Sequence, residues 1–464
     1  MEEIFCDVLI AGGGNAALSA AITAAEKGHS VIVADRAPYH MRGGNTRHTR
    51  DLRAMHTNPT NILSDSYTED EYYEDLIRVT EGNTNDKLAR LTIQKSAELT
   101  DWLFDRGIKF QGALGGTLSL GRTNAFFLGG GRAMLNALYR TAIKLKVKCL
   151  CDTEVLKLNI IDNKFKSAVL KENDIETKIN AKALIIASGG FQGNENWMKE
   201  AWGDISKNFL IRGTPYNTGG LIREMLDNNA IQIGEANQCH AVAIDARAPK
   251  YDGGITSRLD AVPFGIVVNK DGDRFYDEGE DFWPKRYAIW GRLIASQPEQ
   301  IGYCIVDSKS INSFMPSVFP AIQADDINSL AKIVNLDPKN LNRTINNFND
   351  SIVEGEFNHT ILDNCYTKNI NVPKTHWARK IDVAPFYLWP LRPGITFTYL
   401  GLKVNENAEV GMKNLTIGNG NIFAAGETMA GNVLGKGYLA GIGMTIGTVF
   451  GRLAGEGASN YVSS

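Results

Sequence analysis

The sequence lacks a marked charge excess and any hydrophobic run long enough to cross a membrane. Its 464 residues include 49 lysines and arginines against 52 aspartates and glutamates, so the formal net charge is −3. This balance gives no support to a nucleic-acid or membrane-surface partner held by bulk electrostatics. The most apolar stretch, residues 437–450, is interrupted by glycines and is shorter than the roughly 20 residues that span a bilayer. We therefore expect no nucleic-acid partner and no direct membrane insertion.

Cysteine is also scarce. The six cysteines form no C-x-x-C pair and no spacing typical of haem attachment or iron–sulfur ligation, so we expect reduced structural thiols. There is no metal-ligand cluster, serine-nucleophile motif or phosphate-transfer loop, so we predict no metal site and find no support for a hydrolase or kinase. The acidic start, with Glu2 and Glu3, differs from a secretory signal and favours a cytoplasmic protein.

The N-terminal residues show the alternation of a βαβ unit. Residues 7–11 form an apolar run typical of a buried parallel strand, residues 16–27 an alanine-rich helical segment that stops at Gly28, and residues 30–35 a second strand. The turn between the first strand and the helix, residues 12–17, fits the pattern G-x-G-x-x-A. In this pattern the first glycine allows a tight turn, the second lets a pyrophosphate approach, and the alanine packs the helix.

An acidic residue follows this pattern at the place expected for a ribose-binding group. Asp35 closes the second strand. A glycine turn alone is also explained by a tight chain reversal, but here the strand, the helix, the second strand and the terminal acid agree. We therefore predict a bound dinucleotide, with its pyrophosphate at the helix N-terminus.

Two later apolar segments also end in glycine turns. Residues 183–190 and residues 421–427 each indicate a short buried strand followed by such a turn. After the second segment, Gly437 and Tyr438 lie at the start of a Gly/Ala-rich helix, whose N-terminal amides can face the carbonyl oxygens of a bound ring. Close packing of helices is the alternative explanation for these glycines.

The middle of the chain has a different pattern. From about residue 238 it is irregular, interrupted by prolines and rich in charge, and it then becomes helical. Five aromatic residues are interleaved with the charges of residues 272–287, which favours a partly buried polar network over a solvated loop, since buried ions need partners. We predict a nucleotide-binding domain in two parts, residues 1–237 and 379–464, and an inserted domain at residues 238–378.

Together these features resemble the flavoprotein family of succinate dehydrogenase and fumarate reductase. The similarity extends over nearly the whole chain. It rests on residues 12–17 with Asp35, on residues 43–46 (Gly-Gly-Asn-Thr), and on residues 187–191, 272–275 and 425–427. The resemblance implies an α/β fold, in which a Rossmann-like FAD-binding domain of the glutathione-reductase type is interrupted by an α+β capping domain. It also implies FAD as the cofactor.

The resemblance assigns a set of FAD-binding residues. They are Gly12, Gly14, Asn15, Ala16, Ala17, Asp35, Arg36, Gly43, Gly44, Asn45, Thr46, Val155, Ala187, Ser188, Gly189, Gly426, Glu427, Gly437 and Tyr438. We expect the FAD to be noncovalent, because His40 and His48 do not reproduce the Ser-His-Thr arrangement through which membrane-bound members of the family attach the flavin.

Residues 42–56 and 274–290 are most similar to the members of the family that oxidise tricarballylate. This similarity implies oxidation of tricarballylate to cis-aconitate, with a hydride passing to flavin N5 and a proton to an arginine of the capping domain. Fumarate reductases hold a C4 dicarboxylate with a histidine and an arginine, which our alignment replaces with residues 397–401 and Tyr438. Fumarate or succinate is the weaker alternative, since two charge-assisted hydrogen bonds of roughly 1.5–3 kcal/mol each would be lost.

The reaction also needs a proton acceptor and several cations for the carboxylates. By resemblance Arg286 accepts the proton, and because the pKa of arginine exceeds ~12 it needs a relay to carboxylates such as Glu278 and Glu280. A structural ion pair is the alternative for Arg286. The residues expected to bind substrate are Arg47, Arg50, His240, Arg247, Arg258, Tyr399 and Tyr438. Solvated charges, phosphate contacts and plain packing are the alternatives for this set.

The chain has no iron–sulfur or haem motif of its own, so reduced FAD needs an external electron acceptor. The resemblance implies a membrane-bound iron–sulfur partner, which would hold the cytoplasmic protein at the inner face of the membrane. Two alternatives stay open: a flavoenzyme with another substrate, such as a fumarate reductase or a 3-ketosteroid dehydrogenase, and a non-catalytic flavin-binding subunit for electron relay. The density of arginine and lysine in residues 247–292 disfavours a steroid, which requires an apolar pocket.

Overall fold

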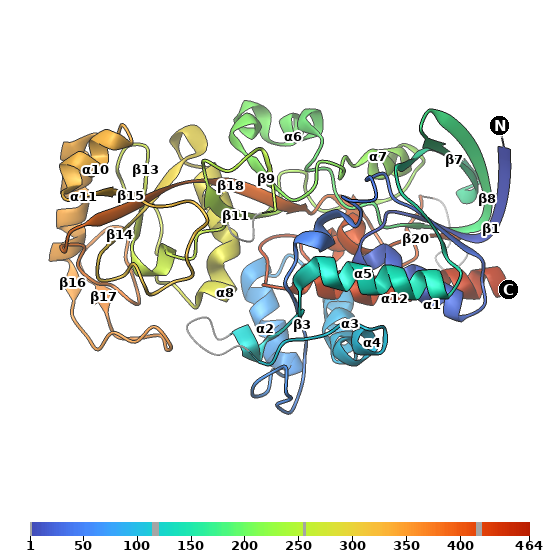
Figure 1. Cartoon of the computed structure of the whole chain (residues 1–464), viewed down its shortest axis with the longest axis horizontal. Helices are drawn as coiled ribbons and strands as arrows, with labels where there is room; N and C mark the ends of the chain where they lie inside the picture. The colour runs from blue at the N-terminus through green and yellow to red at the C-terminus, as the bar shows by residue number, and fades with distance from the viewer. Residues whose placement is uncertain (1, 114–119, 254–256, 414–419) are drawn as a thin grey trace.

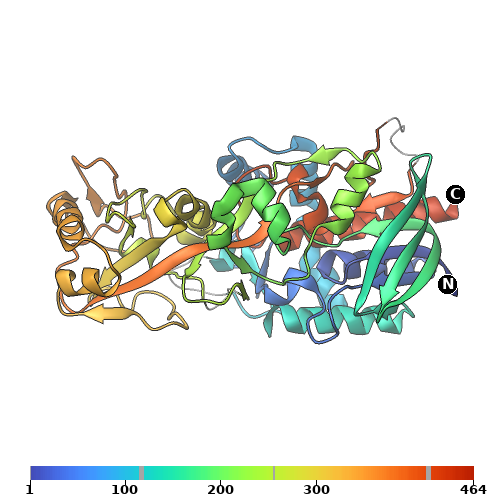
Figure 2. The ribbon, with the colours of Figure 1, turned by 90° about the horizontal axis from the view of Figure 1, so that it is seen from above.

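The computed structural model describes residues 2–113, 120–253, 257–413 and 420–464. The molecule is elongated and has two lobes side by side, each built around one large sheet (Figure 1). Both chain termini lie in one lobe, which we call the nucleotide lobe, and we call the other the cap lobe. The long strand β18 (Phe386–Thr398) extends from the cap lobe towards the nucleotide lobe, as Figure 2 shows from above.

The nucleotide lobe is built on a sheet that contains the predicted βαβ unit. The strands lie in the order β5 (Lys148–Leu150), β2 (Val31–Ala34), β1 (Glu2–Ala11), β8 (Ile175–Ile186), β7 (Lys164–Glu172) and β6 (Thr153–Ile161), and β20 (Ile422–Ala424) also pairs with β8. Strands β6 and β7 are antiparallel to their neighbours, whereas the others pair in parallel. Val8, Leu9 and Ile10 of β1 are fully buried, as expected for a parallel strand that is covered on both faces.

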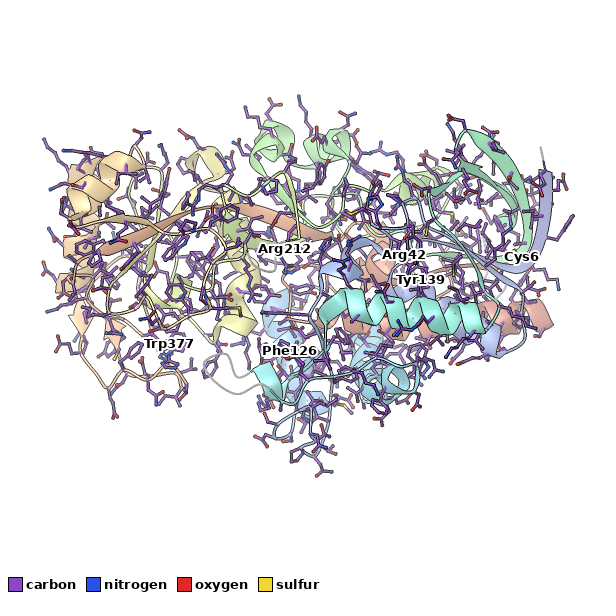
Figure 3. The ribbon with its side chains drawn as sticks, viewed as in Figure 1. Cys6, Arg42, Phe126, Tyr139, Arg212 and Trp377 are labelled. Carbon is purple, nitrogen blue, oxygen red and sulfur yellow. The ribbon has the colours of Figure 1, made fainter. Side chains whose placement is uncertain are left out.

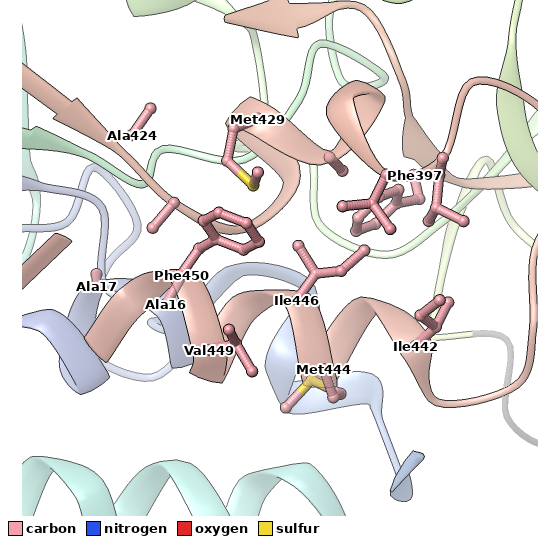
Figure 4. Packing of buried hydrophobic residues seen from close by; sticks show 14 of the residues in the cluster. Ala16, Ala17, Phe397, Ala424, Met429, Ile442, Met444, Ile446, Val449 and Phe450 are labelled. Carbon is pink, nitrogen blue, oxygen red and sulfur yellow. The ribbon is translucent and has the colours of Figure 1, made fainter. Parts of the chain in front are cut away.

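Helix α1 (Asn15–Glu26) packs against the C-terminal helix α12 (Ile442–Ser463) beside this sheet. The contact requires glycine, because a Cβ atom at Gly451 or Gly455 would lie 2.5 or 2.6 Å from a backbone oxygen of α1. Figure 4 shows Ile446 and Phe450 of α12 directed towards Met429 in the buried core. This packing holds the start of α12 close to the N-terminus of α1.

Further elements complete the molecule outside the two large sheets. They are α2 (Glu69–Thr80), α3 (Asp86–Ser96), α4 (Leu99–Asp105), α5 (Gly130–Lys144), α6 (Glu195–Trp202), α7 (Gly220–Asp227), the short helices η1 (Gly44–His48) and η7 (Gly426–Asn432), and the strands β3 (Asp51–Arg53), β4 (Asn124–Phe126), β10 (Gln232–Ile233) and β19 (Gly401–Leu402). A side chain caps the N-terminus of each of α2 and α3. Thr68 Oγ1 accepts a hydrogen bond from the backbone N–H of Glu71, and Asn85 Oδ1 accepts one from the backbone N–H of Leu88.

The cap lobe is built on a second sheet with β18 at its centre. Its strands lie in the order β12 (Tyr251–Asp252), β9 (Leu210–Arg212), β18, β14 (Gly302–Asp307) and β13 (Ile266–Asn269), while β11 (Cys239–Asp245) and β15 (Ile322–Ala324) also pair with β18. The lobe also contains α8 (Trp283–Arg286), α9 (Trp290–Ala295), α10 (Ile327–Ile333), α11 (Pro338–Asp350), β16 (Ile352–Val353) and β17 (Tyr366–Thr367). Strands β9 and β18 belong to this sheet although they lie outside the predicted insertion at residues 238–378.

Within the cap-lobe sheet, β11 pairs antiparallel with β18, and His240 lies opposite Phe397 in the register. Polar contacts join the two lobes: Asp75 of α2 accepts a hydrogen bond from Lys285 Nζ at 2.9 Å. Arg78 of the same helix forms an ion pair with Asp281. The cap segment 281–286 is thereby tied to the nucleotide lobe.

In the described ranges, no helix combines the length and the apolar character that crossing a membrane requires. Nor do these ranges contain a group of three or more histidine, cysteine, aspartate or glutamate side chains placed to hold a metal ion. The six cysteines form no disulfide.

Candidate active site

A cavity is lined by residues of both lobes. The nucleotide lobe contributes the N-terminus of α1 and the carboxyl ends of β1, β2 and β8, and the cap lobe contributes side chains such as Arg258 and Tyr287. The cavity therefore connects the predicted nucleotide-binding turn with side chains of the cap lobe.

The turn before α1 forms one wall of the cavity. Gly12 has a φ of 117°, and a Cβ atom there would lie 2.1 Å from the carbonyl oxygen of Ala187, so only glycine fits. The N-terminus of α1 is held by Asn15, whose backbone N–H donates to Thr46 Oγ1 at 3.0 Å and whose Nδ2 donates to Thr448 Oγ1 at 2.8 Å. The unpaired amides of such a helix start favour a phosphate group.

Asp35 ends β2 at the same side of the cavity. Its carboxylate accepts hydrogen bonds from the backbone N–H groups of Ala37 at 3.0 Å and Gly43 at 2.8 Å. Burial raises the pKa of Asp35, and these two donors oppose the rise. Nearby, Arg42 lies between the rings of Tyr39 and Tyr139, 4.0 and 4.1 Å from their centroids; Arg42 and Tyr139 are labelled in Figure 3. The carboxylate is therefore held in place by the backbone of the loop that follows β2.

Polar groups at the end of β8 and in η7 line the cavity further along. Ser188 Oγ is buried and has no hydrogen-bond partner among the described residues. Glu427 accepts from the backbone N–H of Thr398 at 2.9 Å and from Asn217 Nδ2 at 3.2 Å. Burial raises the pKa of Glu427 to about 7. The glycine cradle, the helix start and the unpaired Ser188 hydroxyl together fit a bound FAD.

Most residues predicted to bind FAD line this cavity. Seventeen of the nineteen do so: Gly12, Gly14, Asn15, Ala16, Asp35, Arg36, Gly43, Gly44, Asn45, Thr46, Val155, Ala187, Ser188, Gly189, Gly426, Glu427 and Tyr438. Ala17 is instead fully buried in the core. Gly437 packs against α2, where a Cβ atom would lie 1.9 Å from the carbonyl oxygen of Val79.

Three arginines line the part of the cavity nearest the cap lobe. They are Arg50, Arg212 of β9 and Arg258; Figure 3 shows Arg212 near the junction of the lobes. Arg258 donates to both carboxylate oxygens of Asp260, at 2.8 and 2.9 Å, and Arg50 lies 3.6 Å from Asp51. Burial lowers the pKa of Arg50 and of Arg212, and the charge of Arg258 adds to both decreases. This end of the cavity favours an anion.

His240 lies among these arginines. Its ring stacks on that of Tyr438, with centroids 3.7 Å apart and planes inclined by 2°, and it meets the ring of Tyr287 edge-on at 5.9 Å. The side chain is buried, and Nδ1 has no hydrogen-bond partner in the parts of the chain that the structure describes. Burial lowers the pKa of His240 well below 6.5, and Arg212 and Arg258 act in the same direction. The imidazole is therefore neutral, with one nitrogen left for a ligand.

The structure places the predicted proton-transfer residues outside the cavity lining. Arg286 Nε donates to Glu280 Oε2 at 2.8 Å and its Nη2 donates to Tyr276 OH at 2.8 Å. Glu278 is buried in a separate network, where it accepts from Arg274 Nε at 3.1 Å and from the backbone N–H of Val267 at 2.8 Å. The ion-pair alternative thus describes the surroundings of Arg286, and the partners of Glu278 belong to a different network.

Three predicted substrate ligands also lie outside the lining. Arg47 donates to the carbonyl oxygen of His40 at 2.8 Å, and Arg247 forms an ion pair of 2.6 Å with Asp245. The hydroxyl of Tyr399 donates to the carbonyl oxygen of Gly437. The structure therefore brings four members of the predicted set together at the cavity: Arg50, His240, Arg258 and Tyr438.

Sequence reasoning missed several cavity residues. They include His48 as a noncovalent contact, Arg212, Asn217, Thr218, Trp283, Tyr287 and Phe397. A usable signal for part of this set is the polar, glycine-containing run of residues 213–220, which follows Arg212 directly. Tyr287 immediately follows Arg286, so the correct segment was recognised but its cavity-facing residue was not.

Comparisons with known proteins agree with this geometry. Residues 7–444 match the family model described as "FAD binding domain". The NADH:fumarate oxidoreductase of Klebsiella pneumoniae is 24% identical over 472 residues, a match that covers 98% of this chain and 47% of the relative. The chain thus spans about half the length of that relative. The fumarate reductase (cytochrome) of Shewanella frigidimarina is 24% identical over 477 residues, covering 98% of this chain and 77% of the relative.

A solved structure shares the fold. The 3-ketosteroid-Δ4-(5α)-dehydrogenase of Rhodococcus jostii RHA1 superposes with a TM-score of 0.75 at 19% identity, covering 99% of this chain and 98% of that chain. The predicted fold class and the predicted FAD cofactor are confirmed. The chain belongs to the FAD-binding domain family of the succinate dehydrogenase and fumarate reductase flavoproteins, and its cofactor is FAD.

Proposed function

We propose that the protein is an FAD-dependent dehydrogenase that oxidises a carbon–carbon single bond beside a carboxylate in a small polycarboxylate. Tricarballylate, converted to cis-aconitate, is the first candidate substrate. The observation that carries the proposal is the grouping of Arg50, Arg212 and Arg258 around the neutral His240 at one end of the FAD cavity. A substrate with three carboxylates has enough negative charge to offset this concentration of cations.

The arginines differ in how they are held. Asp260 fixes the guanidinium of Arg258 by two hydrogen bonds, so that this planar donor is preorganised before substrate binds. Arg212 Nη1 donates to Thr396 Oγ1 at 3.1 Å, which positions its guanidinium beside β18. In a site with little water, each charge-assisted hydrogen bond contributes about 1.5–3 kcal/mol to binding. These side chains would bind and orient the carboxylates.

The chemistry requires a hydride acceptor, which FAD supplies when bound. The protein residues then hold the substrate, exclude water and move a proton. His240 offers a neutral ring nitrogen to a carboxylate or a carbonyl oxygen of the substrate, because its low pKa keeps the ring uncharged. The aromatic rings of Trp283, Phe397 and Tyr438 form apolar parts of the wall and limit access of water.

Turnover also requires an electron acceptor outside the chain, since the sequence has no iron–sulfur or haem motif. We propose a membrane-bound iron–sulfur protein in this role, which would hold the protein at the inner face of the membrane. The name of the Klebsiella relative contains NADH, so a nicotinamide is the alternative redox partner for a reaction in the reducing direction.

The second candidate function is oxidation of a substrate that contains rings, such as a 3-ketosteroid. The aromatic side chains of the cavity favour it, and a 3-ketosteroid dehydrogenase shares the fold. The three arginines argue against it, because their charged donors bind a carboxylate more strongly than a neutral ketone. The polycarboxylate is therefore preferred.

The test is anaerobic bleaching of the flavin absorbance by tricarballylate, succinate and a 3-ketosteroid in separate samples. The proposal predicts bleaching by tricarballylate and a loss of bleaching in Arg258→Met. The matched control is Arg247→Met, a cap arginine whose side chain pairs with Asp245 outside the cavity. Bleaching by the steroid alone would favour the second candidate. If no compound bleached the flavin, a non-catalytic electron-relay subunit would become the preferred function.

A further inference from the structure

We infer that Tyr287 exchanges the proton of the reaction with the substrate, a role that the sequence assigned to Arg286. The inference rests on the proposed function. Tyr287 begins the short helix η5 (Tyr287–Ile289), directly after α8, and its side chain lines the cavity. Arg286, one residue earlier, is absent from that lining and pairs with Glu280.

The hydroxyl of Tyr287 is available for a ligand. The side chain is 7% exposed, and no hydrogen bond to its hydroxyl is found within the described residues. Tyr438, the other tyrosine at this end of the cavity, differs: its hydroxyl accepts from the backbone N–H of Gly443 at 3.1 Å. A hydroxyl that lines a cavity without a protein partner is a group that a ligand can satisfy.

One carboxylate organises the surroundings of Tyr287. Asp260 accepts from Trp283 Nε1 at 2.7 Å and from Arg258 at 2.8 and 2.9 Å. Both partners contact Tyr287: the ring of Trp283 lies 6.3 Å from that of Tyr287, and Arg258 Cζ lies 4.8 Å from the centroid of the Tyr287 ring. His240 meets the same ring edge-on. The phenol is thus held by its neighbours on several sides.

The charges around Tyr287 suit a group that gains and loses a proton. Burial raises its pKa and Asp51 acts in the same direction; Arg258, Arg212 and Arg50 oppose the rise without cancelling it, so the net change in the pKa of Tyr287 is a rise. Cations within a few ångströms stabilise a phenolate. For Arg286, burial lowers the pKa, but Glu280 and Tyr276 more than compensate and the net change is a rise. Arg286 therefore holds its proton more firmly than an ordinary arginine.

Other titratable groups of the cavity suit the role less well. His240 and His48 stay neutral at physiological pH, because burial lowers the pKa of His240 well below 6.5 and that of His48 to about 4. The lowered pKa makes each imidazole a weak proton acceptor. Glu427 is already held by the backbone N–H of Thr398 and by Asn217 Nδ2, at the end of the cavity where η7 begins.

In the oxidising direction, the Tyr287 phenolate oxygen forms an O–H bond with the proton of the carbon beside a carboxylate, and the electron pair of that C–H bond forms the new C=C bond. The neighbouring carbon gives up a hydride with its electron pair, so the substrate is oxidised by two electrons. FAD, when bound, would supply the two-electron acceptor. In the reducing direction the phenol returns the proton to carbon.

The experiment measures anaerobic flavin bleaching by saturating tricarballylate in the FAD-loaded protein and in three variants. Tyr287→Phe should slow bleaching by about 10²- to 10⁴-fold, the usual contribution of general acid–base catalysis, while tricarballylate affinity from a spectral titration changes little. Tyr303→Phe in β14, a buried tyrosine that does not line the cavity, is the matched control and should bleach at the wild-type rate. Arg286→Gln should stay within a few-fold of that rate.

The pH profile gives a second readout. In the wild type the bleaching rate should rise with pH, because oxidation uses the phenolate, and this rise should disappear in Tyr287→Phe. Undiminished bleaching in Tyr287→Phe, or a large loss in Arg286→Gln alone, would overturn the inference and leave the proposed function standing. A wild type that tricarballylate does not bleach would overturn the proposed function, and the inference with it.

Discussion

The buried Asp75 is predicted to stabilise the protein much more than its partner Lys285 does. Asp75 accepts hydrogen bonds from Tyr67 OH and Lys285 Nζ, each at 2.9 Å, and lies 3.8 Å from the guanidinium of Arg53. The side chain of Arg53 is fully buried, whereas that of Lys285 is 21% exposed. Asp75 is therefore the counter-charge of a cation that cannot reach water.

The expected losses of unfolding free energy follow from this difference in exposure between Arg53 and Lys285. Asp75→Asn leaves the charge of Arg53 buried without its carboxylate, which costs about 3–5 kcal/mol of unfolding free energy. Lys285→Met removes a partly solvated cation, and Asp75 keeps Tyr67, Arg53 and Arg78 as partners. We expect a cost of about 1 kcal/mol or less for this variant.

The assay is urea denaturation of the FAD-loaded protein, followed by circular dichroism and flavin fluorescence. Asp75→Asn should lower the denaturation midpoint clearly more than Lys285→Met does, with Lys309→Met, an ion-paired lysine of the cap lobe away from this junction, as a control. Equal losses in Asp75→Asn and Lys285→Met would refute the reasoning, because the charge of Arg53 would then not depend on Asp75.

Three further predictions concern the cofactor, pH and substrate binding. Gly12→Ala should abolish FAD binding, measured as flavin content after purification, because its Cβ would meet a carbonyl oxygen at 2.1 Å; Gly28→Ala, with φ of 89° and open space around its Cβ, should retain FAD. Burial raises the pKa of Glu427 from its ordinary value of 4.5 to about 7, so the folded state binds the carboxyl proton more tightly than the unfolded state does. The contribution of this proton to the free energy of unfolding should therefore fall as the pH rises from 4.5 through about 7. Glu427→Gln should remove that part of the pH dependence in a thermal melt, and an unchanged profile would contradict it. Arg50→Met should weaken tricarballylate binding by about 10- to 150-fold in a spectral titration, the loss of one charge-assisted hydrogen bond of about 1.5–3 kcal/mol, while Arg247→Met should not.

Local signals were sufficient to predict the nucleotide end of the site. The strand predicted at residues 7–11 forms the end of β1, and the helix predicted at residues 16–27 is α1, Asn15–Glu26. These elements depend on neighbouring residues: an apolar run, a turn that only glycine can make at Gly12, and an alanine-rich segment. The sequence therefore carries their positions almost completely.

The substrate end depends on long-range packing, which the sequence does not display. Arg212 reaches the cavity because β9 pairs with β18, a strand that begins far along the chain at Phe386. Arg286 and Tyr287 are neighbours in sequence, yet Glu280 and Tyr276 bind the arginine while the tyrosine lines the cavity. A spacing pattern identifies the charged segment but not which of its side chains is used by neighbouring protein groups.

The measurement that tests the central claim most directly is product analysis after anaerobic reduction. The FAD-loaded protein is mixed with excess tricarballylate, the bleached flavin is quantified by absorbance, and cis-aconitate is quantified by chromatography. The account predicts one molecule of cis-aconitate for each FAD reduced, since both are two-electron changes. Flavin that stays oxidised, or flavin that bleaches without formation of cis-aconitate, would contradict the assignment of this cavity to tricarballylate oxidation.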